Sequence, residues 1–161
     1  MTPRHRPATD MKGPALPASL VLFLTCGFLP AADFAAGVAR TRITPPTPSW
    51  MSGYAARTHP SDGVLEELRA KALAVGDPQG HRVVFLTMDL IGLPREVAEE
   101  VTTRATEQLH LQRSELLLNC SHTHCGPTVG RNPGVLFEFG TEDVKRGEEY
   151  RRTLEDRLVR I

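Results

Sequence analysis

A strand, a helix and a second strand account for the strongest hydrophobic pattern in the chain. Residues 82–88, RVVFLTM, form a continuous β-branched and aromatic run, which predicts a strand covered on both faces. Pro94 suits the first turn of a helix, and apolar residues recur at four-residue spacing from Val97 to Leu109. Three leucines at 116–118 predict a second short strand, also buried on both faces. Elements of these lengths predict a right-handed βαβ unit with parallel strands.

Further elements are predicted on either side of this unit. Alternating side chains over 34–43 predict a half-buried strand. Residues 65–75 fit either a short helix or a strand over 69–75, and the turn sequence at 76–80 favours the strand. Residues beyond 140 predict a charged helix with one apolar stripe, made of Tyr150, Leu154, Leu158 and Ile161. No capping residue follows this helix, so we expect an α/β domain with a mixed sheet and covering helices that is incomplete C-terminally.

Residues 1–32 have the pattern of a secretory signal peptide. A basic start precedes the apolar run Leu16–Leu29, which is too short to span a bilayer comfortably, and small residues follow it. We expect cleavage after Ala32, with Met11 as a second candidate start of the chain. The prediction is a secreted or periplasmic protein whose domain covers 33–161. A membrane-anchored protein that keeps this segment is the alternative.

The charge pattern argues against a nucleic-acid partner, and the cysteine content leaves the pairing of two cysteines open. The 161 residues carry 19 basic and 19 acidic side chains, and no basic run is interleaved with aromatic residues, so we expect no nucleic-acid partner. Cys120 and Cys125 remain after the predicted cleavage. In an oxidising compartment these two cysteines either pair or stay free.

Two histidines lie just beyond the second strand of the βαβ unit. His122 and His124 precede Gly126-Pro127, which turns the backbone. Asp89 ends the first strand, so parallel pairing brings Asp89 and His122 to one sheet edge, where ligands bind in open α/β sheets. Imidazole is the commonest metal ligand and moves protons near neutral pH, although a loop histidine is as often a solvated side chain. Asp89 is either a cap for the backbone that follows it or a site residue.

The loop at 50–57, WMSGYAAR, is a second candidate part of the site. Its aromatic residues, Trp50 and Tyr54, fit a segment that covers the core. The alternative is a wall of the site that includes Gly53 and Tyr54 and leaves Arg57 available to an anion.

Several motifs carry a resemblance to a known family. They are GVAR and ITPP within 37–46, MSGYAAR at 51–57, RAKAL at 69–73, MDL at 88–90, and the stretch from Asn119 through His122-Thr123-His124 to Gly126-Pro127. In this order they resemble the N-terminal catalytic domain of the neutral/alkaline non-lysosomal ceramidase family over residues 37–127. The His-Thr-His-x-Gly-Pro core is the most specific of these motifs.

The resemblance implies a zinc amidase that is secreted or attached to a membrane and that splits the amide of an N-acyl sphingoid base. It implies that His122 is a ligand of Zn2+. It also implies that His124 lies beside the metal as a catalytic residue that binds or polarises the substrate. The implied partners are a lipid amide such as ceramide and a membrane surface.

Two departures from the family pattern change what we expect of this chain. Cys125 stands where the family has a serine after His-Thr-His. The family's other metal ligands and its catalytic serine lie downstream of residue 161, so we expect no nucleophile in this chain and little or no activity from it alone. Two alternatives remain open. One is a small secreted metal-binding protein that uses the cysteines and histidines of 120–125, and the other is a non-catalytic protein that retains the family fold.

Overall fold

The described residues fold into a mixed sheet with two long helices. The computed structural model describes residues 33–46, 48–130 and 139–161, all within one compact unit, Ala32–Ile161. The predicted signal peptide, 1–32, lies outside the described residues. In chain order the elements are β1 (Ala35–Arg42), β2 (Arg69–Gly76), β3 (Arg82–Met88), α1 (Arg95–Leu109), the short 3-10 helix η2 (Arg113–Glu115), β4 (Leu116–Cys120) and α2 (Thr141–Arg160).

The strands follow one another across the sheet in chain order, β1-β2-β3-β4. β1 pairs with β2, and β2 with β3, in antiparallel register, whereas β3 and β4 are parallel. Because α1 connects the parallel pair, the predicted βαβ unit is confirmed. β2 confirms the strand interpretation of residues 69–75, and Asp77–Gly80 forms the predicted turn into β3, closed by a 3.1 Å hydrogen bond from the Gly80 N–H to the Asp77 carbonyl.

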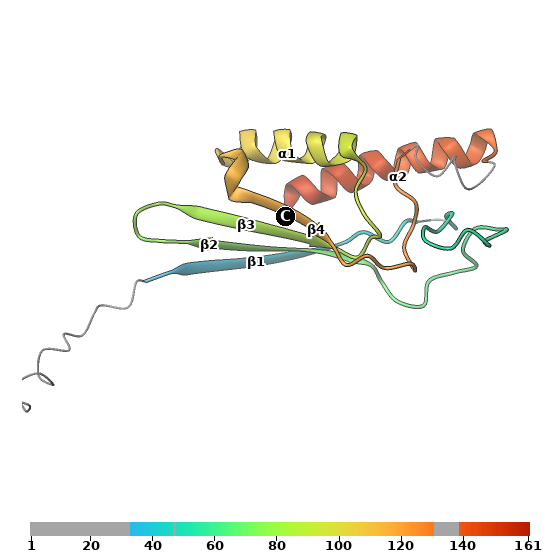
Figure 1. Ribbon diagram of the computed structural model, residues 1–161, viewed down its shortest axis with the longest axis horizontal. Coiled ribbons are helices and arrows are strands. Elements are labelled where there is room, and N and C mark those ends of the chain that lie inside the picture. Colours follow the sequence, from blue (N-terminus) through green and yellow to red (C-terminus); the bar gives the residue numbers. More distant parts are fainter. Residues whose placement is uncertain (1–32, 47, 131–138) are drawn as a thin grey trace, which may run out of the picture. The chain divides into compact units, whose positions relative to one another are not determined.

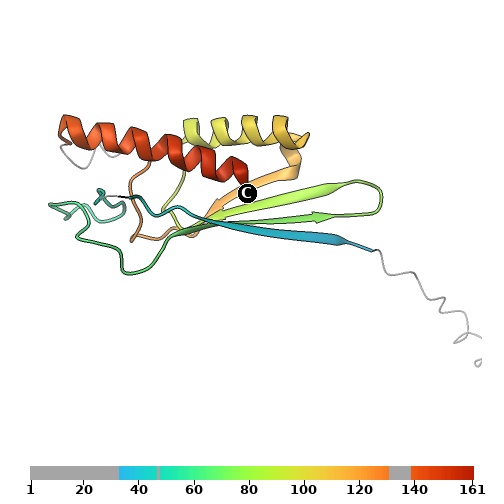
Figure 2. The same ribbon diagram turned by 180° about the vertical axis from the view of Figure 1, so that it is seen from behind.

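Both helices pack on the same face of the sheet (Figures 1 and 2). Val97 and Val101 of α1 and Leu154 of α2 are fully buried, and they join Met88 of β3 in one hydrophobic cluster. The four-residue spacing in α1 and the apolar stripe of α2 are therefore confirmed as core-facing. Leu109 is the exception, because it lies at the last position of α1 and is exposed, so the stripe of α1 is one turn shorter than predicted.

The second helix is fixed to the end of the first strand. The Tyr150 hydroxyl of α2 donates a 2.7 Å hydrogen bond to the carbonyl of Ile43, and both side chains are buried. Burial raises the pKa of the Tyr150 phenol, so it remains a neutral donor. Arg157 adds a second link, since its guanidinium donates to the Arg42 carbonyl at 2.9 Å. These bonds attach α2 to the end of β1, although most of β1 is exposed.

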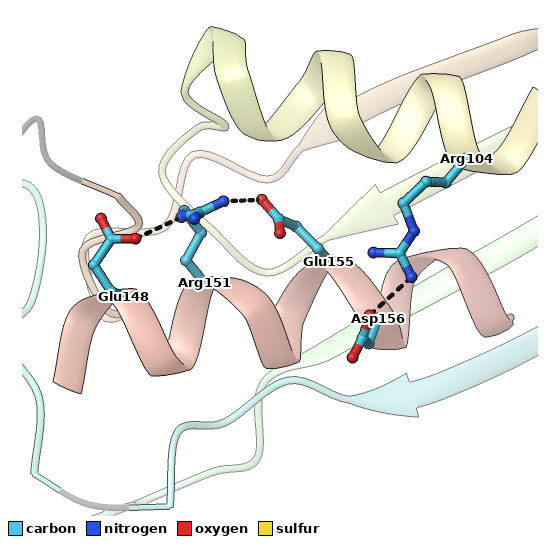
Figure 3. A network of polar contacts seen from close by, with 5 residues as sticks. All are labelled: Arg104, Glu148, Arg151, Glu155 and Asp156. Carbon is cyan, nitrogen blue, oxygen red and sulfur yellow. Dashed lines mark hydrogen bonds and ion pairs between the residues drawn. The ribbon is translucent and has the colours of Figure 1, made fainter. Parts of the chain in front are cut away.

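Charged side chains organise α2 and connect it to α1 (Figure 3). Arg151 lies between two carboxylates of its own helix, Glu148 at 3.0 Å and Glu155 at 2.6 Å. The Glu155 side chain is only 6% exposed, so its charge requires this partner. Arg104 of α1 reaches Asp156 of α2 at 2.8 Å. In the described part of the chain, no helix combines the length and the apolar character needed to cross a membrane.

The other face of the sheet has no covering element among the described residues. Our prediction that β3 and β4 are buried on both faces is therefore wrong, because α1 and α2 lie on one side only. A row of apolar residues crosses this open face in register: Val38, Leu73, Phe85 and Leu117. Val38 is 83% exposed and Leu117 is 47% exposed. The strand predicted at 34–43 is also mostly exposed rather than half-buried, since β1 is one of the two outer strands.

Candidate functional site

Asp89 and His122 lie at the same edge of the sheet, as the parallel pairing of β3 and β4 requires. The last pair in register is Met88 with Cys120, and the Ser121 N–H continues the ladder to the Met88 carbonyl at 2.9 Å. Asp89 follows β3 directly, and His122 lies two residues beyond β4. The edge predicted as a ligand site therefore carries an imidazole from β4 and a carboxylate from β3.

The Asp89 carboxylate closes the end of the β2–β3 ladder. Its Oδ2 accepts a 2.9 Å hydrogen bond from the Arg69 N–H, and the Asp89 N–H donates to the Arg69 carbonyl at 3.0 Å. The cap is thus made to the first residue of β2 and not to the backbone after Asp89. This geometry gives Asp89 a structural role at the edge of the sheet. Its contact with a substrate stays a prediction.

His122 is held in a conformation that presents one ring nitrogen to solvent. Its φ of 59° lies in the left-handed region, which costs a residue with a side chain about 1–2 kcal/mol. The ring Nδ1 lies 2.8 Å from the Ile91 carbonyl oxygen. A carbonyl only accepts, so Nδ1 donates to it, and in the neutral imidazole the lone pair is on Nε2. The side chain is exposed, which leaves Nε2 in the state that binds a metal ion.

His124 lies between His122 and the loop at 50–57. Its ring centroid is 5.3 Å from that of His122 and 5.0 Å from that of Tyr54, with edge-on geometry in both pairs. Gly53 and Arg57 also contact His124. Tyr54 is 55% exposed, so it does not cover the core, and its role as a site wall stays a prediction. The Trp50 ring packs edge-on against Phe139 at 5.5 Å, away from the histidines.

The sequence-predicted residues therefore gather at one edge but do not form a complete metal site. Within the described ranges, no group of three His, Cys, Asp or Glu side chains lies close enough together to hold a metal ion. The ring geometry of His122 is compatible with zinc, and its role as a ligand stays a prediction. The four candidate ligands of 120–125 do not converge as the metal-binding alternative requires.

Cys120 and Cys125 are both free thiols, so the paired alternative is not the one observed. Burial raises the pKa of the half-buried Cys120 thiol, whereas Cys125 is exposed. Because the thiolate is the reactive species, we expect iodoacetamide at pH ~8 to label Cys125 several-fold faster than Cys120. Mass spectrometry of tryptic peptides at successive times measures both rates, and urea-unfolded protein is the control in which the rates converge. Equal rates in the folded protein would contradict the difference in burial.

Two partners at this edge were not predicted. The Ile91 carbonyl that orients His122 is a backbone group and leaves no side-chain signal in the sequence. The Arg69 N–H that binds Asp89 is equally invisible to a motif search. A strand ending in aspartate predicts a cap, but only the antiparallel register shows which backbone it caps.

Comparisons with known proteins identify the family of this chain. A family model described as neutral/alkaline non-lysosomal ceramidase, N-terminal, matches residues 34–143, more than half of the chain. Neutral ceramidase 2 of Arabidopsis thaliana is 35% identical over 98 residues, which is 56% of this chain and 12% of that protein. The neutral ceramidase of Drosophila melanogaster is 32% identical over 115 residues, which is 68% of this chain and 16% of that protein.

Solved structures show the same fold. The crystal structure of neutral ceramidase from Pseudomonas aeruginosa superposes with a TM-score of 0.63 at 20% identity, over 81% of this chain and 21% of that chain. A ceramidase complexed with C2 gives the same TM-score and identity and is covered to 20%. This chain thus spans about a fifth or less of the length of these relatives. By the extent of the family match, the chain belongs to the neutral/alkaline non-lysosomal ceramidase family, within its N-terminal region.

Proposed function

We propose that this chain forms part of the catalytic centre of a zinc-dependent amide hydrolase of the ceramidase type. The observation that supports the proposal best is the state of His122. The Ile91 carbonyl 2.8 Å from Nδ1 fixes both the tautomer and the ring plane, and the exposed Nε2 keeps its lone pair. His59 also places its ring against a backbone carbonyl and His110 also has a left-handed backbone, but among the described histidines only His122 combines the two.

In this proposal the two histidines have different tasks. His122 would hold Zn2+ through Nε2, and bound zinc would supply a Lewis acid that polarises the amide carbonyl. His124 would bind or polarise the substrate, since its ring lies at the same edge 5.3 Å from His122 but is itself packed against Tyr54. Tyr54 and Gly53 would form the wall against which the substrate lies.

The proposed substrate is a lipid amide such as ceramide, because relatives that match over this region are named neutral ceramidases. Access to such a substrate would place the protein at a membrane surface. Secretion through the segment at 1–32 belongs to the same proposal and would bring the site to lipids outside the cytosol.

The described residues alone are not expected to turn over substrate. Catalytic zinc is usually held by three protein ligands, and this part of the chain offers one. We propose that the remaining ligands and the nucleophile come from residues outside those described.

The test compares zinc affinity and ceramide hydrolysis in the 161-residue protein and in the longest polypeptide that the same gene encodes. We expect tight zinc binding and hydrolysis only in the longer polypeptide. His122→Ala should weaken zinc binding about 100-fold or more, since even the loss of an outer partner costs about 10–100-fold. Competition with a chromogenic chelator measures the affinity.

His59→Ala is the matched control, because His59 is an exposed loop histidine whose polar contacts in the described part of the chain are with the nearby Pro60 and Asp62. It should leave zinc affinity and hydrolysis unchanged. Unchanged zinc affinity in His122→Ala would overturn the metal role of His122. Zinc bound tightly by the 161-residue protein, and lost in Cys125→Ser, would support the small metal-binding alternative instead.

A further inference from the structure

Arg57 contacts His124 in a way that neither a core cover nor a free anion-binding arginine explains. Its Nη2 donates a 2.8 Å hydrogen bond to the backbone carbonyl of His124. The same guanidinium lies over the Tyr54 ring, with Cζ 5.2 Å from the ring centroid. The Tyr54 ring in turn packs edge-on against the His124 imidazole at 5.0 Å. Arg57 therefore touches His124 directly through the backbone and indirectly through Tyr54.

The loop that carries Arg57 is fastened beside the histidine turn. Met51 and Pro127 form an antiparallel bridge, the Ser52 N–H donates to the Gly126 carbonyl at 3.0 Å, and the Thr128 N–H donates to the Trp50 carbonyl at 2.8 Å. These bonds align the two segments just before Gly53 and just after His124. Backbone hydrogen bonds to the histidine turn therefore hold the loop that carries Arg57 in place.

Gly53 is the third residue of this loop that contacts His124, beside Tyr54 and Arg57. Its φ is +107°, and a Cβ at this position would lie 2.4 Å from Cγ of His124. The imidazole thus rests against the bare Cα of Gly53 on one side and against Tyr54 on another. With the carbonyl held by Arg57, both the ring and the peptide of His124 are constrained. We call Gly53, Tyr54 and Arg57 the His124 clamp.

The chemistry of the guanidinium suits this task. A planar cation can stack on an aromatic ring and donate from its edge at the same time, which a lysine ammonium cannot do. Arg57 is half-buried, and its Nε is buried without a hydrogen-bond partner among the described residues. A side chain in this position is enclosed by the site wall and is not extended toward solvent to capture a passing anion.

We propose that Arg57 is a positioning residue for His124, which it orients through the carbonyl bond and through the Tyr54 ring. This inference rests on the proposed function for its catalytic meaning, but the clamp itself is a property of the folded chain. Arg57 would act on the reaction only through the orientation of His124. We take His124 to polarise the substrate in the transition state, so the loss of Arg57 should lower kcat and leave KM unchanged.

The first experiment tests the clamp by a measurement that does not depend on catalysis. In the 161-residue protein labelled with 15N-histidine, the imidazole signals of His122 and His124 are assigned with His122→Gln and His124→Gln. Arg57→Gln should shift and broaden the His124 signals and remove the nuclear Overhauser effect between Tyr54 and His124. The His122 signals should shift less than those of His124, since the two rings lie 5.3 Å apart, and they should stay sharp, which also shows that the variant is folded. Arg57→Lys should give an intermediate shift, because it keeps a donor and loses the stacking.

The matched control is Arg40→Gln, which removes an exposed arginine of the outer strand, β1. It should leave the signals of both histidines unchanged. Unchanged His124 signals in Arg57→Gln would overturn the proposal, whatever the activity. A shift of both histidines by the same extent would overturn it as well, since the effect would then be general unfolding of this edge.

The second experiment uses the longest polypeptide encoded by the gene with ceramide as substrate. Arg57→Gln should lower kcat by about 10- to 100-fold at constant KM, as expected for a misplaced catalytic group. A higher KM with unchanged kcat would identify Arg57 as a substrate-binding residue and contradict the positioning role. If the wild-type polypeptide hydrolyses no ceramide while the His124 signals still depend on Arg57, the proposed function fails and the clamp stands.

Discussion

Replacing Gly53 by alanine should lower the free energy of unfolding by about 2–4 kcal/mol, which combines backbone strain with overpacking. The backbone at Gly53 has a φ of +107°, which a residue with a Cβ rarely adopts. The new methyl group would also lie 2.4 Å from Cγ of His124, so the ring or the loop must move. Urea denaturation of the 161-residue protein measures the loss.

Substitutions at Gly80 and Gly63 separate the cost of backbone strain from the cost of overpacking. Gly80 has a φ of +90°, but an added Cβ would meet nothing within 4 Å, so Gly80→Ala should cost about 1 kcal/mol from the backbone alone. Gly63 lies in a loop without a positive φ and with open space around it, so Gly63→Ala should cause no loss. Equal losses at Gly53 and Gly80 would mean that contact with His124 adds nothing, and the clamp would then lack one of its sides.

Replacing Leu154 by alanine should lower the free energy of unfolding by about 2–5 kcal/mol, the range seen for buried leucines. Leu154 is fully buried on α2, where the helix meets the core beneath it. Removing its side chain leaves a cavity between the sheet and α1. These packed elements can move only partly to fill it. Thermal and urea unfolding of the same protein measure the change.

Val144 offers a matched control on the same helix. It is 46% exposed near the start of α2, so Val144→Ala should change the free energy of unfolding by no more than about 0.5 kcal/mol. A loss below about 1 kcal/mol for Leu154→Ala would contradict a core in which α2 packs tightly on the sheet. A similar loss in both variants would show that burial does not set the cost, since alanine is the better helix former at both positions.

Local pattern was sufficient to predict most elements of this fold. The apolar run of β3, the four-residue repeat of α1 and the stripe of α2 each encode one element, and each was found where predicted. β2 was harder, because the alternating alanines of residues 70–74 have good helix propensity. The turn at Asp77–Gly80 decided the question, since a tight turn favours an antiparallel partner over a helix.

Burial was predicted less well than secondary structure, for a physical reason. Leu117 and Phe85 are as apolar as their buried neighbours, Leu116 and Leu86, so the sequence of a single strand cannot show which face is covered. Coverage depends on where the helices lie, and α1 and α2 both lie on one side. A pattern that is local in the chain carries no information on that choice.

For the site, the location was predicted and the contacts were not. Asp89 and His122 follow paired parallel strands, so their common edge follows from the order and direction of the elements alone. The link between Arg57 and His124 joins residues 67 positions apart, and its acceptor is a backbone carbonyl. The family resemblance pointed to His122 and His124 together, but it did not show that a neighbouring loop holds the second histidine.

The separation in sequence between the His124 clamp and His124 itself also bears on how the protein folds. Bonds from the loop at 50–57 to the histidine turn close intervals of 67 to 78 residues, whereas β1, β2 and β3 pair through successive antiparallel connections. Closing a longer interval costs more chain entropy before any contact rewards it. We therefore expect the sheet to form first and the clamp last. The orientation of His124 would then be among the final properties the chain acquires, and the first it loses when the fold begins to open.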